Sequence, residues 1–426
     1  MKKILLISII TLLLLGANLF AERYTLDQLI EIGLSKSYDI QKAKVNDQNS
    51  VSSFRSSLYG LLPSVNLGID KGRSYSTVFV DSLGNHITYD TDWIESGSIS
   101  ISKAFSLNEP SYYNIRNSIY SMDNSNLSFE DTRKKIAFFI FSSYLNVLKA
   151  QETLAIQQKN LELQHKIHQQ IQVQFDAGDK SLLELKQSQV SLIDYEIAVN
   201  EASNNLAKTR RDLFSYLNSK DSGNEFLEPD IDVALKEEKF TDNNALKQKL
   251  NNLKINKLNH FRTIMDFLPT LSIGYTAAHS DIDDAYAFSD YYRSSNTLSL
   301  SASWNIFNLL DNYESYTRSK RNLKLQKLDL NISERNYEIQ LENLQKDLQT
   351  SSRSYELYTE KLTLAEENLK MAQEQFKLGM ISLLDLDRSK IDFQNAQLSH
   401  INSHYNLMKK HEEINLLLSK PILGKW

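Results

Sequence analysis

Residues 174–185, QFDAGDKSLLEL, decide the fold of this chain together with a second copy of the same pattern, QFKLGMISLLDL, at residues 375–386. Each copy holds one glycine, Gly178 or Gly379, in a long stretch that has no other glycine. A lone glycine at the end of a helix favours a left-handed residue that reverses the chain. The serine three residues later, Ser181 or Ser382, can cap the helix that returns. The pattern therefore predicts two long helical hairpins, each turning at one glycine.

The sequence around each turn predicts long helices. No proline or glycine occurs after Pro110 until the first turn, so the first helix would be about 90 Å long at 1.5 Å per residue. The helix that returns is predicted to run to about Ser219, and the second long helix from about Asp311. This second helix carries a heptad stripe, which predicts left-handed supercoiled packing. The stripe consists of Tyr337, Leu341, Leu344, Leu348, Ser351, Tyr355, Tyr358, Leu362, Ala365, Leu369 and Ala372.

Strands are predicted before each long helix. Serine and other small polar residues alternate with aliphatic ones over residues 64–69, 98–102, 270–274 and 298–305. About ten alternating residues suffice for a tilted strand to cross a membrane. Four strands are too few to close a barrel, so if they cross a membrane several chains must share one barrel. A soluble β-sandwich with one solvated face fits this periodicity equally well. Ahead of the first strand, Thr25 and Gln28 form a capping-box pattern, which predicts a helix to about Ser57.

Each half of the chain thus has the order helix, strand, loop, strand, long helix, glycine turn, helix, which indicates a duplication. The N-terminus has two lysines, an apolar run and small residues before Ala21, as in a secretory signal peptide. These boundaries predict a cleaved signal peptide (1–21), a first repeat (22–222), an inter-repeat segment (223–244), a second repeat (245–418) and a C-terminal tail (419–426).

Composition excludes several classes of function. The chain has no cysteine, so it has no disulfide, no thiolate metal site and no lipid-modified N-terminal cysteine. A net charge of −5 gives no drive toward nucleic acid. No catalytic pattern is present, so neither enzyme activity nor a cofactor is predicted. The pairs His165/His168 and His400/His404, and the aspartates 281, 283 and 284, are better explained as solvated side chains than as metal ligands.

The duplicated pattern resembles the outer-membrane efflux proteins, the channel family of TolC. Leu62-Pro63 and Leu268-Pro269 before strands carry the resemblance together with the two F-x-x-G-x-x-S-L-L-[E/D] turns. It covers nearly the whole mature chain, from about Tyr24 to Leu418. The implied fold is mainly α with a β-barrel part: a homotrimer with a twelve-stranded barrel in the outer membrane and an α-helical tunnel across the periplasm. The inter-repeat segment and the tail would form an equatorial region around that tunnel.

The implied function is a passive exit duct of a tripartite efflux or type I secretion system. Its partners would be a periplasmic adaptor protein, an inner-membrane pump or ABC exporter, and outer-membrane lipid. A periplasmic coiled-coil adaptor or scaffold without channel activity is the alternative.

The resemblance also implies roles for the two turns, which would form the periplasmic tip. There the family meets its adaptor and closes its entrance. The residues matching the tip motif are Phe175, Gly178, Ser181, Leu182, Phe376, Gly379, Ser382 and Leu383. Asp385 matches the first acidic position of the entrance constriction, with Glu184 as its equivalent in the first repeat. Arg388 stands at the second acidic position, which implies a ring of mixed charge.

Overall fold

The computed structural model describes residues 23–73, 77–80, 82–89, 93–229, 231, 239–240, 243–282 and 291–426. The predicted signal peptide and part of the inter-repeat segment lie outside them. The chain divides into two compact units. One consists of the residues up to 45 with 128–244 and 334–426, and the other of residues 46–127 and 245–333. Each unit combines segments of both predicted repeats, so the spatial units are not the repeats themselves.

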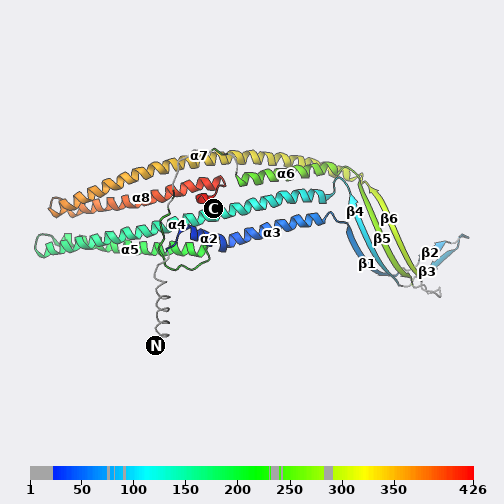
Figure 1. The fold of residues 1–426 in the computed structure, drawn as a ribbon, viewed down its shortest axis with the longest axis horizontal. Coiled ribbons are helices and arrows are strands. Elements are labelled where there is room, and N and C mark those ends of the chain that lie inside the picture. Colours follow the sequence, from blue (N-terminus) through cyan, green and yellow to red (C-terminus); the bar gives the residue numbers. More distant parts are fainter. Residues whose placement is uncertain are drawn as a thin grey trace, which may run out of the picture. The chain divides into compact units, whose positions relative to one another are not determined.

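The predicted long helices are confirmed. Helix α4 (Pro110–Asp176) has 67 residues and is followed by α5 (Leu182–Tyr216), and α7 (Asn308–Lys377) has 70 residues and is followed by α8 (Leu383–Leu417). Figure 1 shows each pair folding back on itself as a hairpin. The returning helices α5 and α8 have 35 residues each, as a duplication requires.

The predicted single N-terminal helix is wrong, because it is divided into α2 (Leu26–Lys36) and α3 (Tyr38–Tyr59). The predicted capping box is confirmed: Thr25 and Gln28 cap α2 reciprocally. At Ser37 the backbone is extended, with φ −60° and ψ 132°. The Ser37 hydroxyl accepts a hydrogen bond from the backbone N–H of Asp39 at 3.2 Å, and so caps the second helix.

Helix α2 packs against α4 and α5 to form the main core of the first unit. Tyr144 and Phe141 of α4 are fully buried there, with Leu29 and Ile30 of α2. A side chain at Gly33 would displace Ile140, because a Cβ atom there would lie 2.1 Å from Cδ1 of Ile140. The absence of a side chain thus lets the short helix approach the long one closely.

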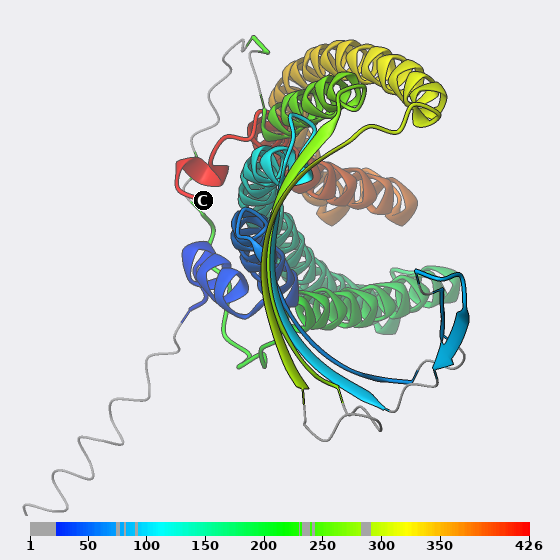
Figure 2. The same cartoon turned by 90° about the vertical axis from the view of Figure 1, so that its right-hand side faces the viewer.

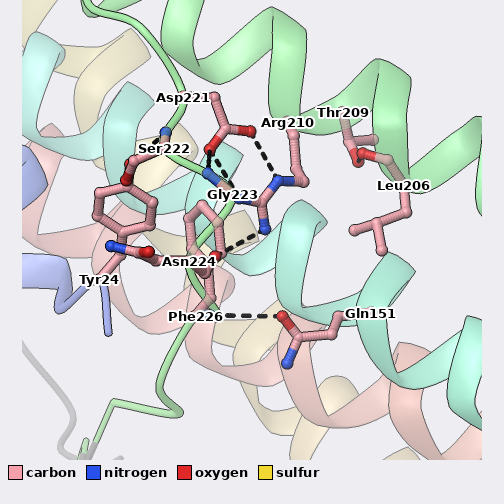
Figure 3. Close-up of polar contacts among 10 residues, drawn as sticks. All are labelled: Tyr24, Gln151, Leu206, Thr209, Arg210, Asp221, Ser222, Gly223, Asn224 and Phe226. Carbon is pink, nitrogen blue, oxygen red and sulfur yellow. Dashed lines mark hydrogen bonds and ion pairs between the residues drawn. The ribbon is translucent and has the colours of Figure 1, made fainter. Parts of the chain in front are cut away.

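Arg210 helps to hold the start of the inter-repeat segment on this core. Arg210 of α5 donates two hydrogen bonds of 2.7 Å to the Asp221 carboxylate and one of 2.9 Å to the Asn224 carbonyl (Figure 3). Its guanidinium also lies 5.0 Å from the ring centre of Phe226. Phe226 forms an isolated parallel bridge with Tyr24, next to the predicted cleavage site. The segment is therefore a fixed part of the first unit wherever the structure describes it.

The heptad stripe of α7 is partly buried in the first unit. Leu341, Leu348 and Leu369 are buried in clusters with residues of α8, whereas Tyr358 is 37% exposed. The stripe is therefore confirmed as a packing surface over part of its length.

The second unit contains an antiparallel sheet in which the strands of the two halves meet. Its order is β1 (Ser64–Gly72), β4 (Ile94–Phe105), β5 (Thr270–Ile282) and β6 (Tyr291–Ser303). The predicted strands are confirmed and extended. A hairpin of β2 (Thr77–Val80) and β3 (His86–Tyr89), in the connection between β1 and β4, was not predicted. Figure 2 shows that the four-stranded sheet is curved.

The two faces of this sheet differ in chemistry. In register across the strands, Ser64 pairs with Ser102, Ser102 with Gly274 and Gly274 with Ser299. Side chains crowd on this face, because a Cβ atom at Gly68 or Gly274 would lie 2.9 Å from a serine Oγ. Crowding of this kind indicates the concave face of a curved sheet.

The opposite face of the sheet is apolar and exposed. Ile69 is 92% exposed, and Leu67, Leu298 and Leu300 are each 77% exposed. Large aliphatic side chains on a sheet are normally covered by a second layer. Within the described residues this face has no such layer.

The helices of the second unit that approach the sheet contact one another through polar pairs. Asn117 of α4 donates to Asn259 of α6 (Asn244–Met265) at 2.8 Å, and Asn124 donates to Asn252 at 2.9 Å. A seven-residue step along α4 therefore repeats the same contact, which fixes the register of the two helices. No described helix has the length and apolar character needed to cross a membrane.

Candidate functional site

The two predicted glycine turns have the same backbone structure. Gly178 ends α4 with φ +84°; its N–H donates to the Phe175 carbonyl at 3.0 Å, and the N–H of Asp179 donates to the Gln174 carbonyl at 2.8 Å. This is a Schellman motif, which requires a left-handed residue after the helix.

The second turn repeats every element of the first. Gly379 ends α7 with φ +71°, and its N–H donates to the Phe376 carbonyl at 3.0 Å. The N–H of Met380 donates to the Gln375 carbonyl at 2.9 Å. The repeated Q-F-x-x-G pattern thus specifies the same helix end twice.

Each returning helix begins with a capping box. The Ser181 hydroxyl accepts from the Glu184 N–H at 3.2 Å, and the Ser181 N–H donates to the Glu184 carboxylate at 2.9 Å. Ser382 and Asp385 make the same reciprocal pair at 3.2 and 3.3 Å. The acidic residue of the S-L-L-[E/D] pattern therefore completes the N-terminal cap of its own helix.

This capping favours the ionised form of both carboxyl groups. The Lys180 ammonium, followed by the backbone N–H of Ser181, lowers the pKa of Glu184 to about 2. The hydroxyl and N–H of Ser382 lower the pKa of Asp385, with a smaller contribution from Arg388. Both carboxylates are therefore ionised at neutral pH. Arg388 is exposed near the start of α8, where its positive charge acts on Asp385.

The predicted tip residues divide into buried and exposed ones. Phe376 and Leu383 are 7% and 4% exposed and pack with Ile167 and Ile171 of α4. In the protomer they therefore join the two hairpins and do not present a contact surface. Leu182 is 57% exposed.

Four further exposed apolar residues lie at the turns and were not predicted: Leu183, Leu378, Met380 and Leu384. The paired leucines of the repeated pattern are the sequence signal for Leu183 and Leu384, whereas Leu378 and Met380 occupy variable positions that carry no such signal. Together with Leu182 they give each turn an apolar end surface.

A buried lysine near the turns was also missed. Lys390 of α8 is 4% exposed and pairs with Asp387 at 2.8 Å. Its ammonium also donates to the Gln164 side-chain carbonyl of α4 and lies 5.6 Å from the ring of Tyr195 of α5. A buried charge must be compensated in this way, and here the compensation ties α8 to the other hairpin.

The histidine pairs have structural contacts. His168 is 2.8 Å from the Ser188 hydroxyl, and His400 and His404 pack against the ring of Tyr355 with centroids 5.3 and 5.2 Å away. Burial lowers the pKa of His400. No group of three possible metal ligands occurs among the described residues. The aspartates 283 and 284 lie outside those residues, and nothing is described of the side chain at 281.

Solved structures show which class of protein has this fold. The CmeC outer membrane channel of Campylobacter jejuni matches with a TM-score of 0.78 and 15% identity, over 94% of this chain and 87% of that one. VceC, an outer membrane protein of Vibrio cholerae, matches with 0.73 and 13%, over 94% and 96%. The open state of the MtrE outer membrane channel of Neisseria gonorrhoeae matches with 0.71 and 12%, over 93% and 89%. At these low sequence identities, the structural similarity establishes the fold alone.

The family follows from the sequence itself. The model of the outer membrane efflux protein family matches residues 29–219 and 265–419, and the chain belongs to this family. The match includes both glycine turns. No curated protein matches the chain significantly by sequence. The family and the fold are those of channels, not of enzymes, and they disfavour the alternative of a scaffold that conducts nothing.

Proposed function

We propose that this protein is the outer-membrane exit duct of a tripartite efflux or type I secretion system. It acts as a homotrimer and passively conducts substrates that an inner-membrane pump or ABC exporter and a periplasmic adaptor deliver. The observation that carries this proposal is the pair of unlike sheet faces. An exposed aliphatic face suits lipid, and a concave face of serine hydroxyls suits water.

The unpaired edges of the sheet support a barrel that is shared between several chains. Among the described strands, β1 and β6 each have one neighbour and one unpaired edge. Unpaired backbone groups are not tolerated in a lipid environment. Copies of the chain that pair β6 with β1 would satisfy both edges, and three copies would give the twelve strands of the proposed barrel.

The glycine turns are the proposed adaptor contact. In this proposal the exposed apolar residues Leu182, Leu183, Leu378, Met380 and Leu384 meet the adaptor. Gly178, Ser181, Gly379 and Ser382 hold the turns that present these residues, and Phe175 lies half-buried beneath the first turn. Nothing in this role requires a cofactor or a metal.

We also propose that Asp385 and Arg388 narrow the periplasmic entrance, with Glu184 in the corresponding position of the first turn. Asp385→Ala and Arg388→Ser should each raise the single-channel conductance in planar bilayers. Val190→Ala, which removes an exposed apolar side chain further along α5, is the control and should leave it unchanged. Wild-type conductance in both entrance variants would remove these two residues from the constriction.

The duct itself is tested by assembly and location. The mature protein should fractionate with the outer membrane and migrate as a trimer that dissociates on heating. It should also form channels in planar bilayers. A protein that stays in the periplasmic fraction and forms no channels would contradict the proposal.

A further inference from the structure

Four helices of the second unit lead into or out of the sheet, and each carries an exposed aromatic residue and an exposed cation. The aromatic residues are between 52% and 66% exposed, and all four cations are exposed. We call these eight residues the collar. Its pairs are Tyr59 with Arg55 on α3, Tyr112 with Arg116 on α4, Phe261 with Lys257 on α6, and Tyr313 with Lys320 on α7.

Within each pair, the two side chains lie on the same face of their helix. Three pairs are four residues apart and that of α7 is seven apart, spacings that bring side chains to one face. The order of each pair depends on the direction of its helix. Helices α3 and α6 run toward the sheet and have the cation first; α4 and α7 run away from it and have the aromatic first. The aromatic residue is therefore nearer the strands in every case.

Lateral contacts put the four pairs at one level beneath the sheet. Ser57 of α3 bonds to Ser118 of α4 at 2.9 Å, and Asn117 of α4 bonds to Asn259 of α6 at 2.8 Å. His260 of α6 stacks on Tyr316 of α7 with ring centres 5.2 Å apart. This row of contacts crosses all four helices. Each collar residue lies within about two helical turns of it.

The collar cations differ from several exposed cations on the long helices. On α4 and α7, Lys166, Lys346 and Lys370 each pair with a glutamate one turn away, at 2.7 to 2.9 Å. None of the four collar cations has an ion pair within the part of the chain that the structure describes. Arg55, Arg116 and Lys257 instead have an aromatic ring one turn away.

Apolar surface connects the collar to the exposed face of the sheet. Leu62 and Leu107 are 64% and 67% exposed where α3 and α4 meet their strands, and Phe307 and Leu310 are 87% and 77% exposed where β6 meets α7. Moving away from the sheet, the named residues therefore run from apolar side chains to the collar aromatics and then to the collar cations. This order of side chains matches the chemistry of a membrane leaflet, from its acyl chains to its phosphates.

We propose that the collar binds anionic phospholipid headgroups in the leaflet that faces the helices. The rings would lie at the level of the glycerol backbone, and the four cations would contact phosphates. The inference rests on the proposed insertion of the sheet into the outer membrane and adds a lipid partner to it. Anionic lipid would then hold the junction between sheet and helices at a fixed depth.

The test compares the association of two spin-labelled lipids, phosphatidylglycerol and phosphatidylcholine, with the full-length trimer in vesicles. The wild type should prefer phosphatidylglycerol about fivefold, the effect of one cation at an anionic surface. The preference should fall strongly in 1 M salt, which screens such contacts. The variant Arg55→Gln, Arg116→Gln, Lys257→Gln, Lys320→Gln should show almost no preference.

The matched control removes four exposed cations that have glutamate partners: Lys166→Gln, Lys346→Gln, Arg353→Gln and Lys370→Gln. It changes the net charge equally and should keep the wild-type preference. Two results would contradict the proposal that the collar binds anionic lipid. One is an equal loss of the preference in the control, and the other is a wild-type preference that is absent or insensitive to salt. Salt sensitivity needs no variant, so the test holds even if the fourfold collar variant fails to form trimers.

Channel formation by the same wild-type preparation separates the two proposals. A conducting protein without the lipid preference would contradict lipid binding by the collar and leave the proposed function intact. A protein that neither inserts nor conducts would contradict both proposals.

Discussion

The two glycine turns have nearly the same sequence and the same backbone, yet different surroundings. Both end a helix in a Schellman motif and begin the next with a capping box. Leu182, the first residue of α5, is 57% exposed, whereas its counterpart Leu383 is 4% exposed. The reason is that α8 starts against Ile167 and Ile171 of α4, whereas Leu182 belongs to no buried cluster among the described residues. Local sequence thus fixes the turn, and its neighbours decide what it exposes.

Truncating the paired leucines gives the largest expected contrast. Leu383→Ala should cost about 3 kcal/mol of unfolding free energy, because it leaves a cavity between the hairpins. Leu182→Ala should cost less than about 1 kcal/mol, since its side chain is exposed. Urea unfolding followed by circular dichroism measures both. Equal losses would mean that a second copy covers Leu182 in the assembled protein, and would remove the contrast seen in the protomer.

The glycines should behave alike, because both need a left-handed backbone. Gly178→Ala and Gly379→Ala should each lose about 1–2 kcal/mol, although no atom within 4 Å would obstruct the new Cβ. Gly97→Ala, with equally open space and no positive φ, is the control and should be nearly neutral. Urea unfolding followed by circular dichroism measures these losses. A large difference in lost unfolding free energy between Gly178→Ala and Gly379→Ala would contradict the equivalence of the two turns.

The capping serines should also be equivalent, with a smaller effect. Ser181→Ala and Ser382→Ala should each cost about 1 kcal/mol, the usual loss of a helix cap. Ser181→Asp and Ser382→Asp should retain most of the stability, because aspartate caps as well as serine does. Hydrogen exchange of the first-turn amides of α5 and α8 would localise the loss. If exchange rose only far from these turns, the capping explanation would be wrong.

The weakest expected contrast is a pH dependence. The pKa of Glu184 falls from 4.5 to about 2 in the folded protein, so its contribution is present above pH 4.5 and is lost as the pH falls toward 2. Glu184→Gln should therefore lower the Tm at pH 6 and have little effect near pH 2. Asp385→Asn should act in the same direction. The comparison needs Tm values of wild type and variant at both pH values; a constant difference between them would exclude titration of Glu184 as the cause.

Much of the fold was predictable because its signals are local. Isolated Gly178 and Gly379 marked the hairpin turns, and alternation of serine with aliphatic residues marked the strands. The break at Ser37 was not predicted, since no proline or glycine marks it. The β2–β3 hairpin was also missed, in a connection where alternation is weak.

The candidate site was predicted less completely. The residues of the repeated pattern were found, but the exposed Leu378 and Met380 occupy its variable positions and gave no signal. Lys390 looked like an ordinary charged residue on α8, because burial by a partner helix cannot be seen in one helix alone. Ser181 and Ser382 were predicted to cap their helices, and Glu184 and Asp385 were predicted for their charge. The bonds that the two serine N–H groups donate to these carboxylates emerged only from the geometry.

The sequence by itself determined the helix ends, the strand alternation and the duplication, because each depends on interactions within a few residues or on a repeated pattern. Only the tertiary structure decided which copy of a repeated residue is buried, which face of the sheet is crowded, and which cations lack a carboxylate partner. Those properties depend on contacts between segments far apart in the chain, and two similar sequence copies can meet different neighbours.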